Sequence, residues 1–312
     1  MRKTCLDMVY ELAKRDQRVI FIGSDLGPGV LDKMRTEIPD RFFMEGVSEA
    51  NIIGMAAGLA LEGFIPYVNT IATFLTRRCF EQISMDLCLH DLPVRLIANG
   101  GGLVYAPLGP THIAIDDMAL MRSQPNMTVV APSDSEEMKR FMNAGIDWPH
   151  PIYIRLGKGG DPVIRSGDNE FTIGKGIVYR EPVDLLIAAT GVMTNRALAA
   201  AELLATQGIA AGVVHFATVK PLDNELLESL ARRVRLIVTL DEHLVSGGLG
   251  SAVLECINEA NLERAPRIHR IGIPDQFTHQ YGSQDSLMES FGLQPDQIAV
   301  AVAGLAKTTL AA

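Results

Sequence analysis

Hydrophobic residues recur along this chain with two alternating periods. Short apolar runs, typical of buried strands, are separated by stretches in which apolar residues recur every three or four positions, as in helices. The predicted strands are 18–26, 41–44, 66–69, 94–98, 127–130, 152–156, 171–179, 183–189, 211–216, 236–240 and 268–273. The predicted helices are 2–16, 49–62, 74–90, 116–122, 135–147, 195–207, 224–232, 250–261 and 295–306.

Strands that alternate with helices predict parallel sheets covered on both faces. A polar segment rich in glycine, 157–162, separates two such patterns. A chain of 312 residues has the length of two ordinary domains. We therefore expect two consecutive three-layer α/β domains with largely parallel sheets, at 1–160 and 170–312.

The helix predicted over 49–62 carries an acid in its first turn. Ser48 precedes it, where a hydroxyl can accept a bond from an unpaired backbone N–H. Gly54 and Gly58 lie four apart on one face, which we expect to pack against something close. On spacing alone, Glu49 is most simply an acid that complements the helix dipole.

Polar residues follow several predicted strands. Ser24 and Asp25 end the first strand, Glu49 follows another, and the loop 100–112 ends in His112. Ligands of parallel sheets sit at the carboxyl ends of strands, where loops gather. These residues are therefore expected to share one rim.

Composition narrows the class of protein. The net charge of −9 and the lack of a Lys/Arg run argue against a nucleic-acid partner. The cysteines are scattered without a Cys-x-x-Cys pair, as in buried thiols of a reducing compartment. The first twenty residues lack the uninterrupted apolar core of a signal peptide, and no apolar run in the sequence is long enough to span a membrane. The sequence therefore predicts a soluble, cytoplasmic protein that does not associate with a membrane.

The segment 46–51, Gly-Val-Ser-Glu-Ala-Asn, followed by the glycine-bearing helix, resembles the pyrimidine-binding segment of the transketolase family. This resemblance implies that Glu49 contacts the aminopyrimidine of thiamine diphosphate and is catalytic. It also implies that the Phe74 ring packs on that pyrimidine, although a phenylalanine is ordinarily a core residue. Arg77, one turn beyond Phe74, is either an active-site cation or a surface charge. Asp25 is a further candidate cofactor contact.

The unit Gly-Pro-Thr-His at 109–112 is similar to the Asp-Gly-Pro-Thr-His-Gln loop of that family. The resemblance implies that His112 binds the sugar and moves protons on it. Two positions depart from the family pattern: Leu108 replaces an aspartate that recognises a hydroxyl, and Ile113 replaces a glutamine. Losing a carboxylate alters hydroxyl recognition, so a deoxy, branched or otherwise modified sugar is expected.

Two cations end the first domain. Lys158 lies roughly where the family places a phosphate-binding arginine, and Arg155 is close enough to assist. Lysine can neutralise a phosphate, but without the bidentate fork of arginine. Solvated charges of a hinge are an equally simple interpretation of both residues.

The second half resembles the family's C-terminal domain in three segments, 189–191, 219–223 and 241–251. In this family that domain is mainly structural and helps to assemble the oligomer. The glycine-rich piece 247–250 is compatible with a phosphate cradle, but the resemblance favours a tight turn between strand and helix.

Thiamine enzymes hold a divalent metal with a Gly-Asp-Gly segment, and this sequence has none. The resemblance therefore implies a split transketolase, of which this chain is the C-terminal subunit. An N-terminal subunit would hold the diphosphate through Mg²⁺ or Ca²⁺. A dimer of this chain would form a heterotetramer with two partners and transfer a two-carbon ketol unit between a ketose and an aldose.

Three alternatives remain open. A deoxyxylulose-phosphate synthase-like subunit would condense pyruvate with an aldehyde and release carbon dioxide. A 2-oxoacid dehydrogenase β-like subunit has the same two domains, but the Gly-Pro-Thr-His unit favours sugar chemistry. A non-catalytic scaffold would keep the fold, whereas the joint presence of Glu49, Phe74 and His112 favours an enzyme.

Overall fold

The computed structural model describes residues 1–24, 29–164 and 170–310. They form two compact units, which are described separately: unit 1 comprises Met1–Gly101 and Leu120–Ile173, and unit 2 comprises Gly102–Ala119 and Gly174–Ala312. Asp25 lies outside the described residues.

Unit 1 is built on a parallel sheet. Its strands follow the order β5-β6-β4-β3-β1-β2, and neighbouring strands in this series run in the same direction. The strands are β1 (Val19–Gly23), β2 (Phe42–Met44), β3 (Ile65–Ile71), β4 (Arg95–Asn99), β5 (Thr128–Val130) and β6 (Ile152–Leu156). The helices are α1 (Arg2–Arg15), α2 (Asp32–Glu37), η1 (Pro39–Arg41), α3 (Glu49–Leu61), η2 (Phe74–Arg78), α4 (Phe80–Gln82), η3 (Ile83–Cys88) and α6 (Ser135–Ala144).

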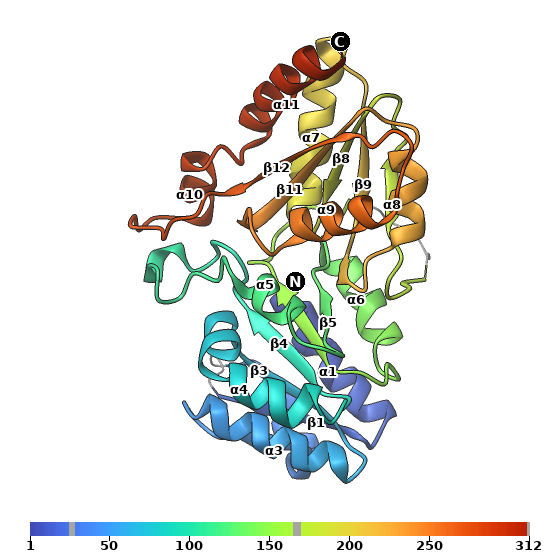
Figure 1. Ribbon diagram of the computed structural model, residues 1–312. Coiled ribbons are helices and arrows are strands. Elements are labelled where there is room, and N and C mark those ends of the chain that lie inside the picture. Colours follow the sequence, from blue (N-terminus) through green and yellow to red (C-terminus); the bar gives the residue numbers. More distant parts are fainter. Residues whose placement is uncertain (25–28, 165–169, 311–312) are drawn as a thin grey trace. The chain divides into compact units, whose positions relative to one another are not determined.

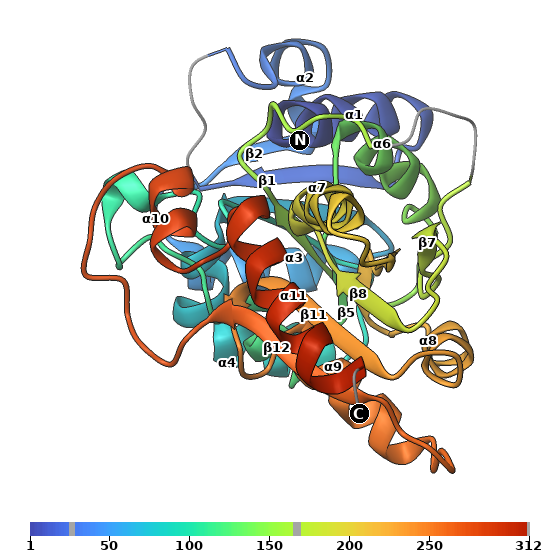
Figure 2. The ribbon, with the colours of Figure 1, turned by 90° about the horizontal axis from the view of Figure 1, so that it is seen from above.

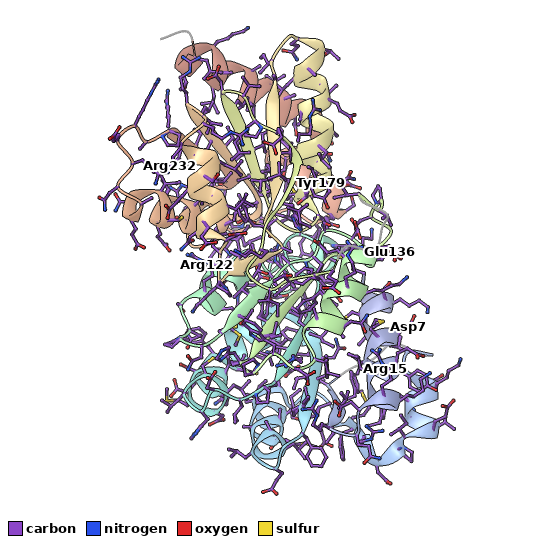
Figure 3. The ribbon with its side chains drawn as sticks, turned by 90° about the vertical axis from the view of Figure 1, so that its right-hand side faces the viewer. Asp7, Arg15, Arg122, Glu136, Tyr179 and Arg232 are labelled. Carbon is purple, nitrogen blue, oxygen red and sulfur yellow. The ribbon has the colours of Figure 1, made fainter. Side chains whose placement is uncertain are left out.

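Helices cover both faces of this sheet. In both ribbon views α3 and α4 lie on one face, and α1 and α6 lie together on the other (Figure 1, Figure 2). The inner strands β1, β4 and β6 are buried along their whole length and are mostly apolar, as expected of strands that are covered on both faces. Charged side chains such as Asp7 and Arg15 of α1 extend from the outer surface (Figure 3).

Unit 2 contains a second sheet in the order β12-β11-β8-β9-β7, parallel except for the edge strand β7. The strands of this sheet are β7 (Ile177–Arg180), β8 (Leu185–Ala189), β9 (Ala211–His215), β11 (Leu236–Leu244) and β12 (Arg267–Ile273). The short strand β10 (Thr218–Lys220) of this unit does not belong to it. The helices are η4 (Ala106–Leu108), α7 (Met193–Thr206), α8 (Asn224–Ala231), α9 (Leu249–Glu259), α10 (Gln284–Ser290) and α11 (Pro295–Leu310). Helix α5 (Asp117–Arg122) crosses the division between the units.

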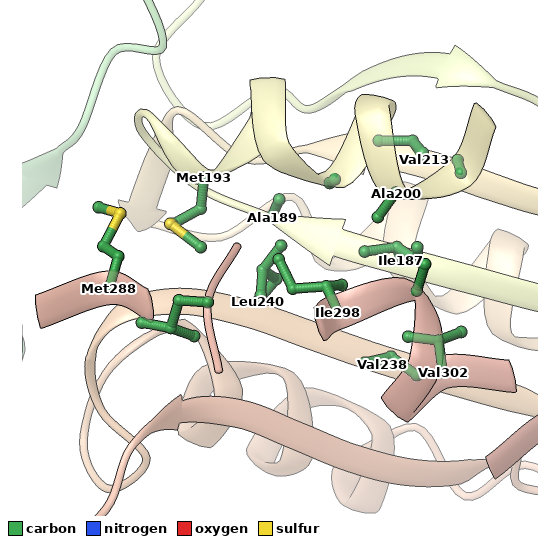
Figure 4. Packing of buried hydrophobic residues seen from close by; sticks show 14 of the residues in the cluster. Ile187, Ala189, Met193, Ala200, Val213, Val238, Leu240, Met288, Ile298 and Val302 are labelled. Carbon is green, nitrogen blue, oxygen red and sulfur yellow. The ribbon is translucent and has the colours of Figure 1, made fainter. Parts of the chain in front are cut away.

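The core of unit 2 lies between its sheet and two helices. Side chains of α7 and α11, among them Met193, Ala200 and Val302, pack on Ile187 of β8 and Val238 of β11 (Figure 4). On the other face α8 packs beside α9 (Figure 1). Two α/β units with largely parallel sheets confirm the predicted fold class.

One predicted helix is wrong in detail. The sequence predicts a continuous helix over 74–90, whereas the structure divides it into the π-helix η2, the short α4 and the π-helix η3. The Thr76 hydroxyl donates to the Ala72 carbonyl at 2.9 Å and the Cys79 thiol to the Phe74 carbonyl at 3.3 Å. Such competing bonds disturb the regular ladder, and π-turns are frequent at functional sites.

Candidate functional site

The carboxyl ends of β1 and β3 form a topological switch point in unit 1. The chain leaves β1 toward β2 and leaves β3 toward β4, so the connections diverge on opposite sides of this pair. In open α/β sheets such a point is the usual position of a ligand. Here Ser24 follows β1 and Thr70 belongs to β3, and the Ser24 hydroxyl donates to the Thr70 Oγ1 at 2.6 Å.

Glu49 extends this polar connection from the first turn of α3. Its side chain is only 4% exposed, and its Oε1 lies 3.5 Å from the Thr70 hydroxyl. The N-terminus of a helix favours a carboxylate. Ser48 does not supply the predicted cap, because its hydroxyl donates to the Glu45 carbonyl at 3.0 Å instead. A buried carboxylate thus faces the switch point.

Arg78 and Phe74 complete this cluster from the two ends of η2. The Arg78 Nη1 lies 3.2 Å from the Glu49 Oε2, and its guanidinium carbon lies 3.7 Å from the centroid of the half-buried Phe74 ring. Arg77, the arginine predicted from the sequence, is exposed. Sequence reasoning missed Arg78, although its spacing of four residues from Phe74 is one at which helical side chains meet.

Further polar groups line the carboxyl edge of this sheet. The Asn99 amide donates to the Asn69 Oδ1 at 3.1 Å, and both residues are buried. Thr73 is 1% exposed, and its hydroxyl has no hydrogen-bond partner among the described residues. Buried polar groups normally have a hydrogen-bond partner. The Thr73 hydroxyl, next to Phe74 in the sequence, is therefore suited to a ligand that supplies a polar atom. The aromatic face, the buried carboxylate and this hydroxyl together suit a planar, nitrogen-rich ring.

The pKa of the Cys79 thiol is shifted by burial and by its neighbours in this cluster. Burial and the nearby Glu49 carboxylate raise the pKa of its thiol to about 12, while the Arg78 guanidinium acts in the opposite direction. The thiol therefore stays protonated at neutral pH. Since a thiolate is the reactive form, Cys79 serves packing and not nucleophilic chemistry.

The loop with His112 belongs to unit 2. The buried Glu242 accepts bonds from the Leu103 N–H at 2.7 Å and from the Gln284 amide at 2.9 Å. The His243 ring donates from Nδ1 to the Leu244 carbonyl at 2.8 Å and accepts the Ala119 N–H at Nε2 at 3.2 Å. These partners assign the neutral tautomer with the proton on Nδ1.

His112 lies in the middle of this anchored segment, one turn after η4. Its ring is half-buried, and Nδ1 lies 2.9 Å from the Thr111 hydroxyl. Leu108 is 49% exposed, whereas Ile113 is buried in the core of unit 2. The isoleucine that departs from the family pattern thus has a packing role. Glu49 and His112 lie in different units.

The two cations near the end of β6 differ in environment. Arg155 is only 7% exposed and its stem lies against Gly101, where a Cβ would come within 2.5 Å of the Arg155 Cγ. Lys158, beyond the strand, is exposed. Arg155 is therefore positioned by packing, and Lys158 is a point charge at the surface.

Neither a metal-binding cluster nor a membrane-spanning helix occurs in the described residues. No group of three or more His, Cys, Asp or Glu side chains in that part of the chain is arranged to hold a metal ion. No helix within the same residues has both the length and the apolar character needed to cross a membrane.

Two family models match most of the chain. The model for the pyrimidine-binding domain of transketolase matches residues 1–160, and the model for the transketolase C-terminal domain matches residues 174–298. A solved structure described as a split gene transketolase, inactive beta4 tetramer, is 36% identical with a TM-score of 0.87 and covers 97% of this chain and 96% of that one. Transketolase from Pichia stipitis, at 20% identity and a TM-score of 0.78, shares the fold.

Two curated relatives differ in length. A 1-deoxy-D-xylulose-5-phosphate synthase of Microcystis aeruginosa is 39% identical over 294 residues, which cover 93% of this chain and 45% of the synthase. The 6-deoxy-6-sulfo-D-fructose transketolase subunit SqwH of Clostridium sp. strain MSTE9 is 37% identical over 300 residues, which cover 96% of this chain and 92% of the subunit. This chain thus spans less than half of the synthase and nearly all of the subunit.

The chain belongs to the transketolase family and comprises its pyrimidine-binding and C-terminal domains. The resemblance inferred from the segment 46–51 is confirmed.

Proposed function

We propose that this chain is the C-terminal subunit of a split, thiamine diphosphate-dependent transketolase. The observation that carries the proposal is the buried Glu49 carboxylate at the switch point of unit 1, beside the aromatic face of Phe74. Relatives of this length include a transketolase subunit, which supports a division of the enzyme between two chains.

The residues of unit 1 fit the pyrimidine end of thiamine diphosphate. Phe74 offers a ring face, Glu49 a carboxylate, and Thr73 a buried hydroxyl that has no hydrogen-bond partner in the described structure. When bound, the cofactor supplies a carbon nucleophile that carries the two-carbon unit. Glu49 would hold a proton at its carboxylate against a pyrimidine ring nitrogen, and its burial would keep water away from that proton. Asp25 and Arg77 remain proposed contacts to the cofactor.

The residues proposed to bind the sugar are His112, Arg155 and Lys158. His112 would donate and accept protons on sugar oxygens, and its bond with Thr111 orients the ring. Arg155 and Lys158 would neutralise an anionic substituent of the sugar. Leu108 stands where the family has an aspartate that recognises a sugar hydroxyl. The loss of this carboxylate supports a modified ketose as the donor. The name of the Clostridium relative specifies such a sugar, a sulfonated deoxyketose.

The partner would be an N-terminal subunit that holds the diphosphate through Mg²⁺ or Ca²⁺. Several exposed apolar side chains on unit 1 support assembly with other chains. Val47 precedes α3 and is 73% exposed, Leu61 is the last residue of α3 and is 65% exposed, and Leu89 follows η3 and is 68% exposed. Gly54 and Gly58 lie exposed on α3, and a Cβ added at either would have no atom closer than 4.0 Å, so this face is open to another backbone. We propose a dimer of this chain within a heterotetramer.

Calorimetric titration with thiamine diphosphate and Mg²⁺ tests the proposal, using this chain alone and mixed with an N-terminal transketolase subunit. Tight binding of the cofactor by the mixture, but not by this chain alone, supports a site shared between the two subunits. Tight metal-dependent binding by this chain alone, or no binding in either case, contradicts it. Glu49→Gln in the mixture should strongly reduce turnover of ketose donors while leaving assembly intact.

A second candidate is a synthase of the deoxyxylulose-phosphate type, which the identity of 39% to the Microcystis enzyme favours. That enzyme class consumes pyruvate, so release of carbon dioxide from labelled pyruvate distinguishes the two candidates. The transketolase proposal expects no release from pyruvate and transfer from a ketose.

A further inference from the structure

Arg78 occupies the part of unit 1 in which a bound pyrimidine would be held. Its guanidinium carbon lies 3.7 Å from the centroid of the Phe74 ring, and its Nη1 lies 3.2 Å from the Glu49 Oε2. One side chain thus uses both the aromatic face and the buried carboxylate. While Arg78 is in this position, the Phe74 ring face and the Glu49 Oε2 are not available to another planar hydrogen-bond donor.

A guanidinium and an aminopyrimidine offer this site the same chemistry. Both are flat, both present N–H donors in the plane of a conjugated N–C–N unit, and both stack on an aromatic ring. The guanidinium gains from the ring face and from the carboxylate together. Arg78 is therefore a structural stand-in for the pyrimidine.

Arg78 is also free to leave without dismantling the site. Its side chain is 50% exposed, whereas Glu49 is 4% exposed. Among the described residues Glu49 is its one polar partner. When Arg78 moves out, Glu49 retains its contact with Thr70, which Ser24 holds in turn. These contacts of Glu49 are therefore preserved in both positions of Arg78.

We propose that Arg78 fills the pyrimidine subsite when no cofactor is bound and thereby sets how tightly this chain takes the cofactor. This proposal rests on the proposed function. Only molecules in which Arg78 has left the site can bind the cofactor. The apparent affinity for the cofactor is therefore reduced in proportion to the fraction of molecules in this open state. The site is accordingly selective for planar groups of the amidine type, such as a guanidinium or the edge of an aminopyrimidine.

The test measures binding, not turnover, and uses the full chain. The probe is 4-amino-5-hydroxymethyl-2-methylpyrimidine, titrated by saturation-transfer NMR against the unmodified chain, Arg78→Ala, Arg78→Lys and Arg35→Ala. Arg35 is an exposed arginine of α2, so its substitution removes the same charge away from Phe74 and Glu49. Circular dichroism establishes that the variants fold alike.

Arg78→Ala should bind the probe about three- to tenfold more tightly, because a half-exposed ion pair and a surface cation–π contact each contribute modestly. Arg35→Ala should match the unmodified chain, and Arg78→Lys should fall between, since lysine lacks the planar fork. Methylguanidinium should displace the probe from Arg78→Ala at lower concentration than from Arg35→Ala.

Equal affinity of Arg78→Ala and the unmodified chain would overturn the proposal while leaving the pyrimidine site intact. Weaker binding by Arg78→Ala would also overturn it, because Arg78 would then hold the probe and not exclude it. No saturation transfer in any variant would contradict the pyrimidine site itself, and the proposed function with it.

Discussion

The backbone N–H of Leu103 donates to the Oε1 of Glu242 at 2.7 Å, across a sequence separation of 139 residues. Gly102 permits this approach, since a Cβ there would lie within 2.4 Å of the Glu242 side chain. The bond fixes the beginning of the segment that carries His112 to β11 of unit 2. A buried carboxylate of the C-terminal domain therefore positions a loop whose sequence precedes that domain.

Replacing Glu242 tests the strength of this anchor. In Glu242→Ala the Leu103 N–H and the Gln284 amide lose their shared acceptor, so the free energy of unfolding should fall by about 2–3 kcal/mol. Urea denaturation measures the change. Glu259→Ala, which removes an exposed acid of α9, should alter it by less than about 0.5 kcal/mol. Equal stability of both variants would contradict the role of Glu242.

Glu49→Gln tests the catalytic assignment. The amide keeps the size of the side chain but cannot hold the proton, so kcat of the complete enzyme should fall by about 10²- to 10⁴-fold. Steady-state kinetics with the partner subunit measure this loss, and thermal unfolding monitors the fold. Near-normal turnover would remove Glu49 from the mechanism.

Gly101→Ala tests the position of Arg155. The new methyl group would overlap the Arg155 stem, so the free energy of unfolding should drop by about 1–3 kcal/mol and the guanidinium should be displaced. A double-mutant cycle with Arg155→Ala checks the cause, because the clash vanishes when the stem is removed. Additive effects of the two substitutions would show that another neighbour is responsible.

Three buried thiols predict a loss of stability in alkaline solution. Burial raises the pKa of Cys5 and of Cys79 to about 12 and that of Cys256 to about 11, from 9.0. Above pH 9 the unfolded chain loses thiol protons that the folded chain keeps, so stability should fall as the pH rises from about 9 toward 12. Urea midpoints across this range measure it.

Cys79→Ala checks that the thiols cause this trend. The variant lacks one of the raised pKa values, so its stability should decline less steeply with pH between about 9 and 12. An unchanged slope in the variant would assign the alkaline effect to other groups.

The sheets could be predicted well because their signal is local. Apolar runs such as 152–156 and 236–240 are long enough to be recognised, and strands buried on both faces show no competing pattern. The helix that begins at Glu49 was also predicted within one residue of its observed end at Leu61. Local backbone preferences and the helical period were sufficient there.

Other features depended on contacts that no spacing reveals. The choice between Arg77 and Arg78 depends on the π-turn of η2, which the Cys79 and Thr76 side-chain bonds accompany. Sequence alone could not show that Leu103 and Ala119 are held by Glu242 and His243.

The fold class, the two α/β units and the place of Glu49 at the start of its helix follow from the order of amino acids alone, because hydrophobic periodicity and helix-end chemistry act over a few residues. Three-dimensional packing was needed to establish which cation meets Glu49, why Gly101 and Gly102 must be glycines, and which unit holds the His112 loop. Those outcomes are set by side chains that meet across long sequence separations, where packing and burial select between arrangements that local preference leaves equal.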